Sequence, residues 1–178
     1  TLLVKGTYFL TIPLYSRLLT TNDYGNVSIF MTYANVLSIV LSFYMAASVS
    51  TGVIKFQKNK NDFLASVLTF SIIIFVLFVI VFQFFHNQFE AIFQLNYGML
   101  MCLLLYSFGQ HVINFNSSKL IMDYDYKKNA AISFGVLVVD TILSTILIIF
   151  LNGQGVLARI LGATIPSASV GIIIILYI

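Results

Sequence analysis

Asp140 has the clearest potential for chemistry, because it lies inside the apolar run 130–151. It follows Asn129 by eleven residues, or roughly 16 Å of helix, which places it near the middle of a membrane span. A charge there costs about 2.5 to 3.5 kcal/mol unless the carboxyl group is protonated, paired or hydrated. Asp140 is therefore a candidate for ion coupling, with protons as the ion. The alternative is a protonated carboxyl group hydrogen-bonded to a neighbouring helix.

His111 is a second candidate, deep within the run 97–118. An imidazole can shuttle a proton or bind a metal, but no second His or Cys stands at ligand spacing, and Cys102 is expected to be a buried thiol. We therefore expect His111 to make a structural hydrogen bond from the wall of a cavity. The sequence predicts no metal, no cofactor and no catalytic residues. An enzyme is not expected, because no nucleophile, base and orienting group are gathered.

Two arginines, Arg17 and Arg159, lie near the ends of apolar runs. The planar guanidinium group keeps its charge and matches a phosphate group. Its ordinary role at a helix end is to extend to the lipid headgroups. For Arg159, as for Lys5 in the first run, both a cavity-facing and a headgroup-facing orientation stay open.

The composition indicates that this chain has a membrane as its solvent. Of 178 residues, 60% are hydrophobic and 8% charged, with a mean hydropathy of +0.99, against roughly 45–50% apolar and 25% charged in soluble domains. So few polar groups cannot cover a soluble core. The net charge of +3 is dispersed, so nucleic acid is not an expected partner.

Six apolar runs are long enough to cross the bilayer, which takes about 20 helical residues. We predict an all-α, polytopic membrane helix bundle that forms a single domain over residues 1–178. The predicted spans cover about 1–19, 27–54, 63–85, 97–118, 130–151 and 158–178. Both ends of the sequence fall inside apolar runs, so we expect a fragment of a longer chain.

The lysines predict the orientation of the spans. Cytoplasmic loops are enriched in Lys and Arg, and lysines gather after the second run and after the fourth. The connection after the third run holds neither Lys nor Arg, and the first and fifth hold one arginine each. This alternation predicts a cytoplasmic N-terminus. The two groups are Lys55, Lys58 and Lys60, then Lys119, Lys127 and Lys128.

Polar side chains recur at steps of three and four residues along the second, fourth and fifth spans, whereas residues 70–82 are apolar nearly all round and are expected to face lipid. Polar faces in a membrane point to other helices or to water. Tight helix packing explains any single Ser or Thr, but three such faces favour a bundle around a hydrated cavity. The cavity-lining candidates are Thr32, Asn35, Ser42, His111, Asn114 and Ser144.

The segment KGTYFLTIPLYSRLLTTNDYGNVSIF, residues 5–30, resembles the first helix and following turn of bacterial polysaccharide flippases. These are members of the multidrug, oligosaccharidyl-lipid and polysaccharide exporter superfamily. Similar segments follow in the same order: GVIKFQKNKNDFLAS at 52–66, YDYKKNAAI at 124–132 and ARILGA at 158–163. The resemblance implies that the six spans form the N-terminal lobe of a two-lobe transporter in the bacterial cytoplasmic membrane.

The resemblance also implies a function. Such proteins translocate a polyprenyl-pyrophosphate-linked oligosaccharide repeat unit by alternating access, for capsule, O-antigen or exopolysaccharide synthesis, beside a polysaccharide polymerase and glycosyltransferases. Arg17 matches the arginine at the end of the family's first helix, which implies a contact with the pyrophosphate. Arg159 matches an arginine with no role to transfer. Relatives often carry an arginine-rich segment at the end of the fourth helix, but here Lys119 is the nearest cation, which puts substrate contact there in doubt.

Two other functions fit the same residues. An ion-coupled drug or small-molecule antiporter of the same superfamily would use Asp140 and would not recognise polyprenyl lipids. A membrane-embedded enzyme of envelope assembly, the more distant alternative, would need His111 for turnover.

Overall fold

A computed structural model of the chain describes residues 11–42, 49, 51–53, 55–151 and 153–177. The regular elements within these ranges are helical, and five helices are long and apolar enough to cross a membrane. The prediction of an all-α, polytopic membrane helix bundle is confirmed. The five helices are α2 (Thr21–Ser42), α4 (Lys60–Phe84), α6 (Tyr97–Met122), α7 (Tyr126–Phe150) and α8 (Gly155–Tyr177).

The first predicted span lies partly outside the described residues, which include its helical segment 11–18. Lys5 lies outside them altogether. α2 begins at Thr21 rather than at the predicted residue 27, because Thr20 and Asp23 cap it. The Thr20 hydroxyl accepts a hydrogen bond from the Asp23 N–H at 3.2 Å and donates one to the Asp23 carboxylate at 2.8 Å. The first bond satisfies one of the free N–H groups of the first helical turn, so the predicted polar loop is largely helix.

The connection after α4 contains a short helix that the sequence pattern did not predict. α5 (His86–Phe93) ends at Gln94, whose φ of 54° is left-handed. The Phe89 ring stacks on Phe82 of α4 with centroids 4.0 Å apart, and Phe93 packs against the same core cluster. Eight residues give too few helical turns for a recognisable period among the polar residues around them.

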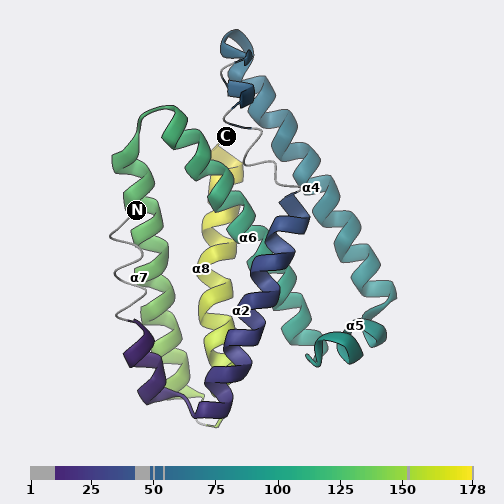
Figure 1. Ribbon diagram of the computed structural model, residues 1–178, viewed down its shortest axis with the longest axis vertical. Helices are drawn as coiled ribbons and strands as arrows, with labels where there is room; N and C mark the ends of the chain where they lie inside the picture. Colours follow the sequence, from purple (N-terminus) through teal and green to yellow (C-terminus); the bar gives the residue numbers. More distant parts are fainter. Residues whose placement is uncertain (1–10, 43–48, 50, 54, 152, 178) are drawn as a thin grey trace.

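α8 lies at the centre of the bundle, between α6 and α7 (Figure 1). α2 runs beside α6 and α8, and α4 leans away on the side opposite α7. One core cluster joins α2, α6 and α8 through the fully buried side chains of Phe30, Leu103 and Ile160. This arrangement leaves α4 the most separate of the long helices.

Glycines allow the closest approaches of α8 to its neighbours. A Cβ added to Gly162 would lie 2.4 Å from the Cα of Ser144 on α7. One added to Gly109 on α6 would lie 2.6 Å from the carbonyl oxygen of Ser167 on α8. Small residues let membrane helices pack backbone to backbone. Between these two contacts lies Pro166, which has no N–H to donate to the carbonyl of Gly162.

The connections alternate between the two ends of the bundle. The short helix η1 (Gln57–Asn59) and the α6–α7 turn lie at one end, where Lys60 forms an ion pair with Asp123. At the other end, the start of α8 at Gly155 packs against Leu19. The two groups of lysines therefore share one end, as the alternation predicted. The cytoplasmic assignment of that end stays a prediction.

The exposed face of α4 is apolar, in agreement with the lipid-facing surface predicted for residues 70–82. Phe70, Ile73, Val76, Leu77 and Ile80 are all between 46% and 56% exposed. The opposite face carries Ser71 and Phe82, which are buried. Exposed apolar side chains are unfavourable in water, but they are favourable on a surface that the hydrocarbon of a membrane covers.

We predict that Gly109→Ala lowers the free energy of unfolding by about 1 to 3 kcal/mol, because the new methyl group would overlap backbone atoms that cannot rotate away. Gly135→Ala on α7 is the matched control, since a Cβ there meets nothing within 4 Å. It should be neutral or stabilising by up to about 1 kcal/mol. Denaturant titration in detergent, followed by circular dichroism, measures both variants. Equal unfolding midpoints for the two would contradict the tight α6–α8 contact.

Candidate functional site

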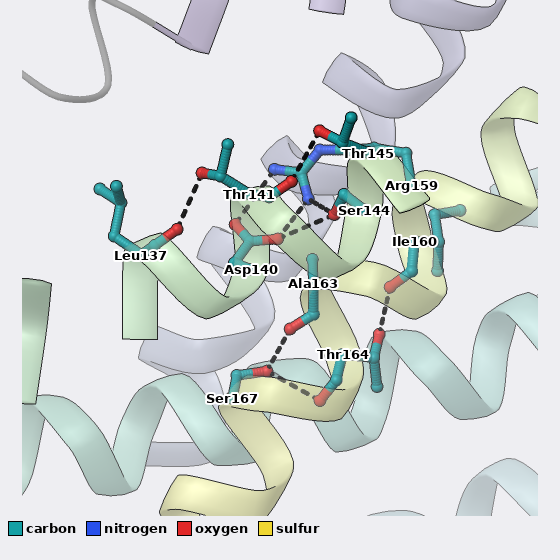
Figure 2. Close-up of polar contacts among 10 residues, drawn as sticks. All are labelled: Leu137, Asp140, Thr141, Ser144, Thr145, Arg159, Ile160, Ala163, Thr164 and Ser167. Carbon is teal, nitrogen blue, oxygen red and sulfur yellow. Dashed lines mark hydrogen bonds and ion pairs between the residues drawn. The ribbon is translucent and has the colours of Figure 1, made fainter. Parts of the chain in front are cut away.

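Arg159 of α8 and Asp140 of α7 form an ion pair inside the bundle (Figure 2). Nη1 lies 2.5 Å from Oδ1, and Nη2 lies 3.3 Å from Oδ2, so two nitrogens face two oxygens. The side chains are only 9% and 16% exposed. This fork-to-fork geometry is the strong form of the arginine–carboxylate contact. Pairing is thus how the bundle accommodates the acid in the middle of α7.

Two further side chains complete the cluster. The Ser144 hydroxyl accepts from Nη1 of Arg159 at 2.8 Å and donates to Oδ1 of Asp140 at 3.1 Å. The ring of Tyr15, from the segment 11–18, lies 4.5 Å from the guanidinium carbon in a cation–π contact. We call Arg159, Asp140, Ser144 and Tyr15 the charge-pair cluster.

The Arg159 side chain extends toward the middle of the bundle. Gly162 sits against Ser144, and α7 and α8 are antiparallel. Arg159 therefore lies about one helical turn from this contact, toward the end of the bundle where α8 begins. Asp140 lies about one turn from the contact in the opposite direction, toward the middle of α7. The side chain bridges an axial offset of roughly 10 Å at 1.5 Å per residue. This geometry contradicts the interpretation of Arg159 as a headgroup anchor.

Two hollows meet at Asp140 and Tyr106, which line both. The larger has a volume of about 540 Å³ and lies between the segment 11–18, α2 and the charge pair. The smaller, of about 200 Å³, lies between α6, α7 and α8. Polar residues line each: Ser28, Asn35 and Arg159 in the larger hollow, and Gln110, Asn114, Ser117 and Ser133 in the smaller.

Several predicted cavity residues do lie at these hollows. Asn35 lines the larger hollow and Asn114 the smaller, and both are exposed. Ser144 lies behind Asp140 and is fully buried, so its role is to hold the charge pair. Polar faces of α2, α6 and α7 thus converge on Asp140.

Another predicted cavity residue, Thr32, lines neither hollow. Thr32 is exposed, and its hydroxyl donates to the carbonyl of Ser28 at 2.9 Å. This bond to the preceding turn is the packing alternative given for a single Thr. The side chain of Ser42 lies outside the described part of the chain.

His111 is 2% exposed and also lines neither hollow. Its ring lies 6.2 Å from the Phe108 ring, and neither ring nitrogen has a hydrogen-bond partner among the described residues. The expected hydrogen bond from a cavity wall is therefore not formed there. The polar residues of α6 are spread around the helix: Ser107 donates to the carbonyl of Ala34 on α2, whereas Gln110, Asn114 and Ser117 line the smaller hollow.

Arg17 is exposed and lines neither hollow. It stands two residues after Tyr15, which puts the two on nearly opposite faces of the helical segment 11–18. Tyr15 points to the charge pair, so Arg17 points away from it. The cation that faces the larger hollow is Arg159, and the pyrophosphate contact of Arg17 stays a prediction.

The cluster offers a polar site in which one cation is balanced by one carboxylate. Asp140 balances the charge of Arg159, and hydroxyl and amide groups surround the pair, so the hollows present hydrogen-bond donors and acceptors without a net charge. Among the residues that the structure describes, no group of three or more His, Cys, Asp or Glu side chains could hold a metal ion. Such a lining suits uncharged polar ligands.

Comparison with known proteins gave no match: no family model, no curated protein and no solved structure is similar to this chain. The resemblance to polysaccharide flippases accordingly rests on the four sequence segments quoted above.

We predict that Asp140→Ala lowers the free energy of unfolding by about 3 to 5 kcal/mol, because it leaves the guanidinium group buried without a counter-charge. The double variant Asp140→Leu, Arg159→Met removes both charges and should recover most of that loss. Asp62→Ala, which removes an exposed carboxylate, should change stability by at most about 1 kcal/mol. Denaturant titration in detergent measures all three. If Asp140→Ala were as stable as the unaltered chain, that result would show that the ion pair is not buried.

Proposed function

We propose that this chain is part of a flippase that translocates a polyprenyl-pyrophosphate-linked oligosaccharide across the bacterial cytoplasmic membrane by alternating access. The observation that carries the proposal is the convergence of polar faces from three helices on two hollows inside a membrane bundle. The resemblance of the four segments supplies the substrate class. A bundle that served only as an anchor would have no reason to keep Asp140 and Arg159 in its interior.

The chemistry of the larger hollow fits sugar hydroxyl groups. Sugars are neutral and need both donors and acceptors, which Ser28, Asn35 and the charge-pair cluster offer. About 540 Å³ lies within the roughly 300–1,000 Å³ of small-ligand sites, enough for one section of an oligosaccharide. The lipid tail would stay in hydrocarbon, and the pyrophosphate would contact Arg17 on the exposed face of the segment 11–18.

The antiporter alternative depended on Asp140 as an acid in need of a proton. Arg159 now supplies a counter-charge and two hydrogen bonds, so a proton is not needed to stabilise the carboxylate. An antiporter would still require Asp140 to change its protonation state during transport. Asp140→Asn would then abolish ion coupling while leaving polyprenyl lipids unaffected.

A thiol-labelling experiment tests whether the hollows admit water. In the full-length protein with Cys102 replaced by Ser, cysteines introduced by Asn35→Cys and Asn114→Cys should react with a small hydrophilic thiol reagent, because both positions are exposed at the hollows. Val112→Cys is the control, since Val112 is fully buried on α6 beside Ile113 and should stay unlabelled. Protection of both Asn35→Cys and Asn114→Cys would leave only a packed bundle and remove the support for transport.

The substrate class is tested in cells. Arg17→Ala should reduce surface polysaccharide and cause lipid-linked repeat units to accumulate on the cytoplasmic side, because the cation for the pyrophosphate is lost. Lys58→Ala, which removes an exposed cation at the opposite end of the bundle, is the matched control and should export normally. Normal export by Arg17→Ala at equal membrane abundance would exclude the pyrophosphate role.

A further inference from the structure

A third hollow lies at the lysine-bearing end of the bundle, far along the helices from the charge-pair cluster. Its volume is about 310 Å³, and it is formed where α6 ends, α7 begins and α8 ends. We call it the interfacial hollow. Its lining includes Lys119, Asp123, Asp125, Lys128, Ile132 and Ile173.

The charges around the interfacial hollow leave Lys119 without a counter-charge. Asp123 pairs with Lys60 of α4. Asp125 lies 2.6 Å from the Lys128 ammonium group and also accepts from the Lys128 N–H at 3.4 Å. This hydrogen bonding holds the pKa of the Asp125 carboxyl below its usual range, so both partners stay charged at neutral pH. Lys119 is half-buried and has no ion-pair or hydrogen-bond partner for its ammonium group among the described residues.

The deeper wall of the interfacial hollow is apolar. Ile132 lies about two turns into α7, and Ile173 lies about one turn before the end of α8. Ile173 is 63% exposed. It lines the same hollow as the charged groups. Tyr124 and Tyr126 are 80% and 55% exposed beside it, where tyrosines typically mark the boundary between membrane and water. Within the described part of the chain, the rim of the hollow therefore carries two paired carboxylates and one unpaired cation, Lys119, and the hollow is apolar toward the membrane interior.

We propose that the interfacial hollow binds an anionic glycerophospholipid of the surrounding membrane. The headgroup phosphate contacts Lys119, and an acyl chain runs along Ile132 and Ile173. Basic pockets between helices at the membrane surface suit such headgroups. A zwitterionic lipid would bring its own ammonium group close to Lys119 along with its phosphate, and a free phosphate ion would leave the isoleucines uncovered. The proposal is independent of the transport function.

The test uses the purified, delipidated full-length protein titrated with phosphatidylglycerol or phosphatidylcholine, with bound lipid counted by native mass spectrometry. Lys119→Gln should weaken phosphatidylglycerol binding about fivefold, as for one lysine near an anionic surface, and leave phosphatidylcholine binding unchanged. Lys119→Arg should retain binding. Lys58→Gln, with the same loss of charge at the same end, is the matched control and should bind phosphatidylglycerol normally.

Three outcomes would overturn the proposal. Equal binding of phosphatidylglycerol by Lys119→Gln and Lys58→Gln would mean that Lys119 is not the headgroup contact. Displacement of phosphatidylglycerol by millimolar inorganic phosphate would indicate a site for a soluble anion. If Lys119→Gln weakened the binding of a polyprenyl phosphate, titrated in the same way, and left phosphatidylglycerol binding unchanged, the hollow would instead be part of the substrate path.

Discussion

The permanent charge of Arg159 is the constraint on which the interior of this bundle depends. A guanidinium group cannot lose its proton in a protein, so a bundle that holds one in a membrane must surround it with partners. Asp140 balances the charge, Ser144 takes a further hydrogen bond, and the Tyr15 ring covers one face. These partners come from α7 and from the segment 11–18, and Arg159 itself belongs to α8. The position of one cation therefore fixes how the segment 11–18, α7 and α8 sit together.

The packing of α8 follows from the same requirement. Ser144 can hold the charge pair only if α7 and α8 approach closely, which the absence of a side chain at Gly162 allows. Gly109 serves the same purpose between α6 and α8. Backbone contacts of this kind depend on shape rather than on the hydrophobic effect, which does not act between helices in lipid. Helix proximity and charge pairing thus stabilise the same arrangement.

Much of the fold could be predicted from the sequence because span length, apolar content and lysine placement are each local properties. The lipid-facing surface of α4 followed from residues 70–82 alone. The site was harder to predict from the sequence than the fold. Asp140 could be recognised as an acid in need of a partner, but its partner depends on the register between α7 and α8. The short connection between α7 and α8 places Arg159 nearer the end of the bundle than Asp140. The two side chains meet only because the arginine side chain is long enough to span that offset. Neither residue spacing nor composition encodes this reach.

The differences between the predicted and the observed positions have a common physical origin. His111 and Thr32 belong to stripes that share a face only approximately, and neighbouring helices decide which members meet water. Ser107, three residues before Gln110, bonds to α2 instead. The boundary error at α2 arose because Thr20 and Asp23 are polar, although their polarity caps a helix. Polarity in sequence therefore indicates that a partner is required without saying whether that partner is water, backbone or an ion.

Pro166 removes one backbone hydrogen bond from the middle of α8. Its ring interrupts the hydrogen-bond ladder at the carbonyl of Gly162, and the hydroxyls of Thr164 and Ser167 bond back to carbonyls on either side (Figure 2). Such features soften a helix against bending. Pro166 thus separates two halves of α8: one half carries the buried cation, and the other contacts Gly109 of α6 at Gly171. The missing hydrogen bond leaves the weakest point of the α8 backbone between its contact with Asp140 and its contact with α6.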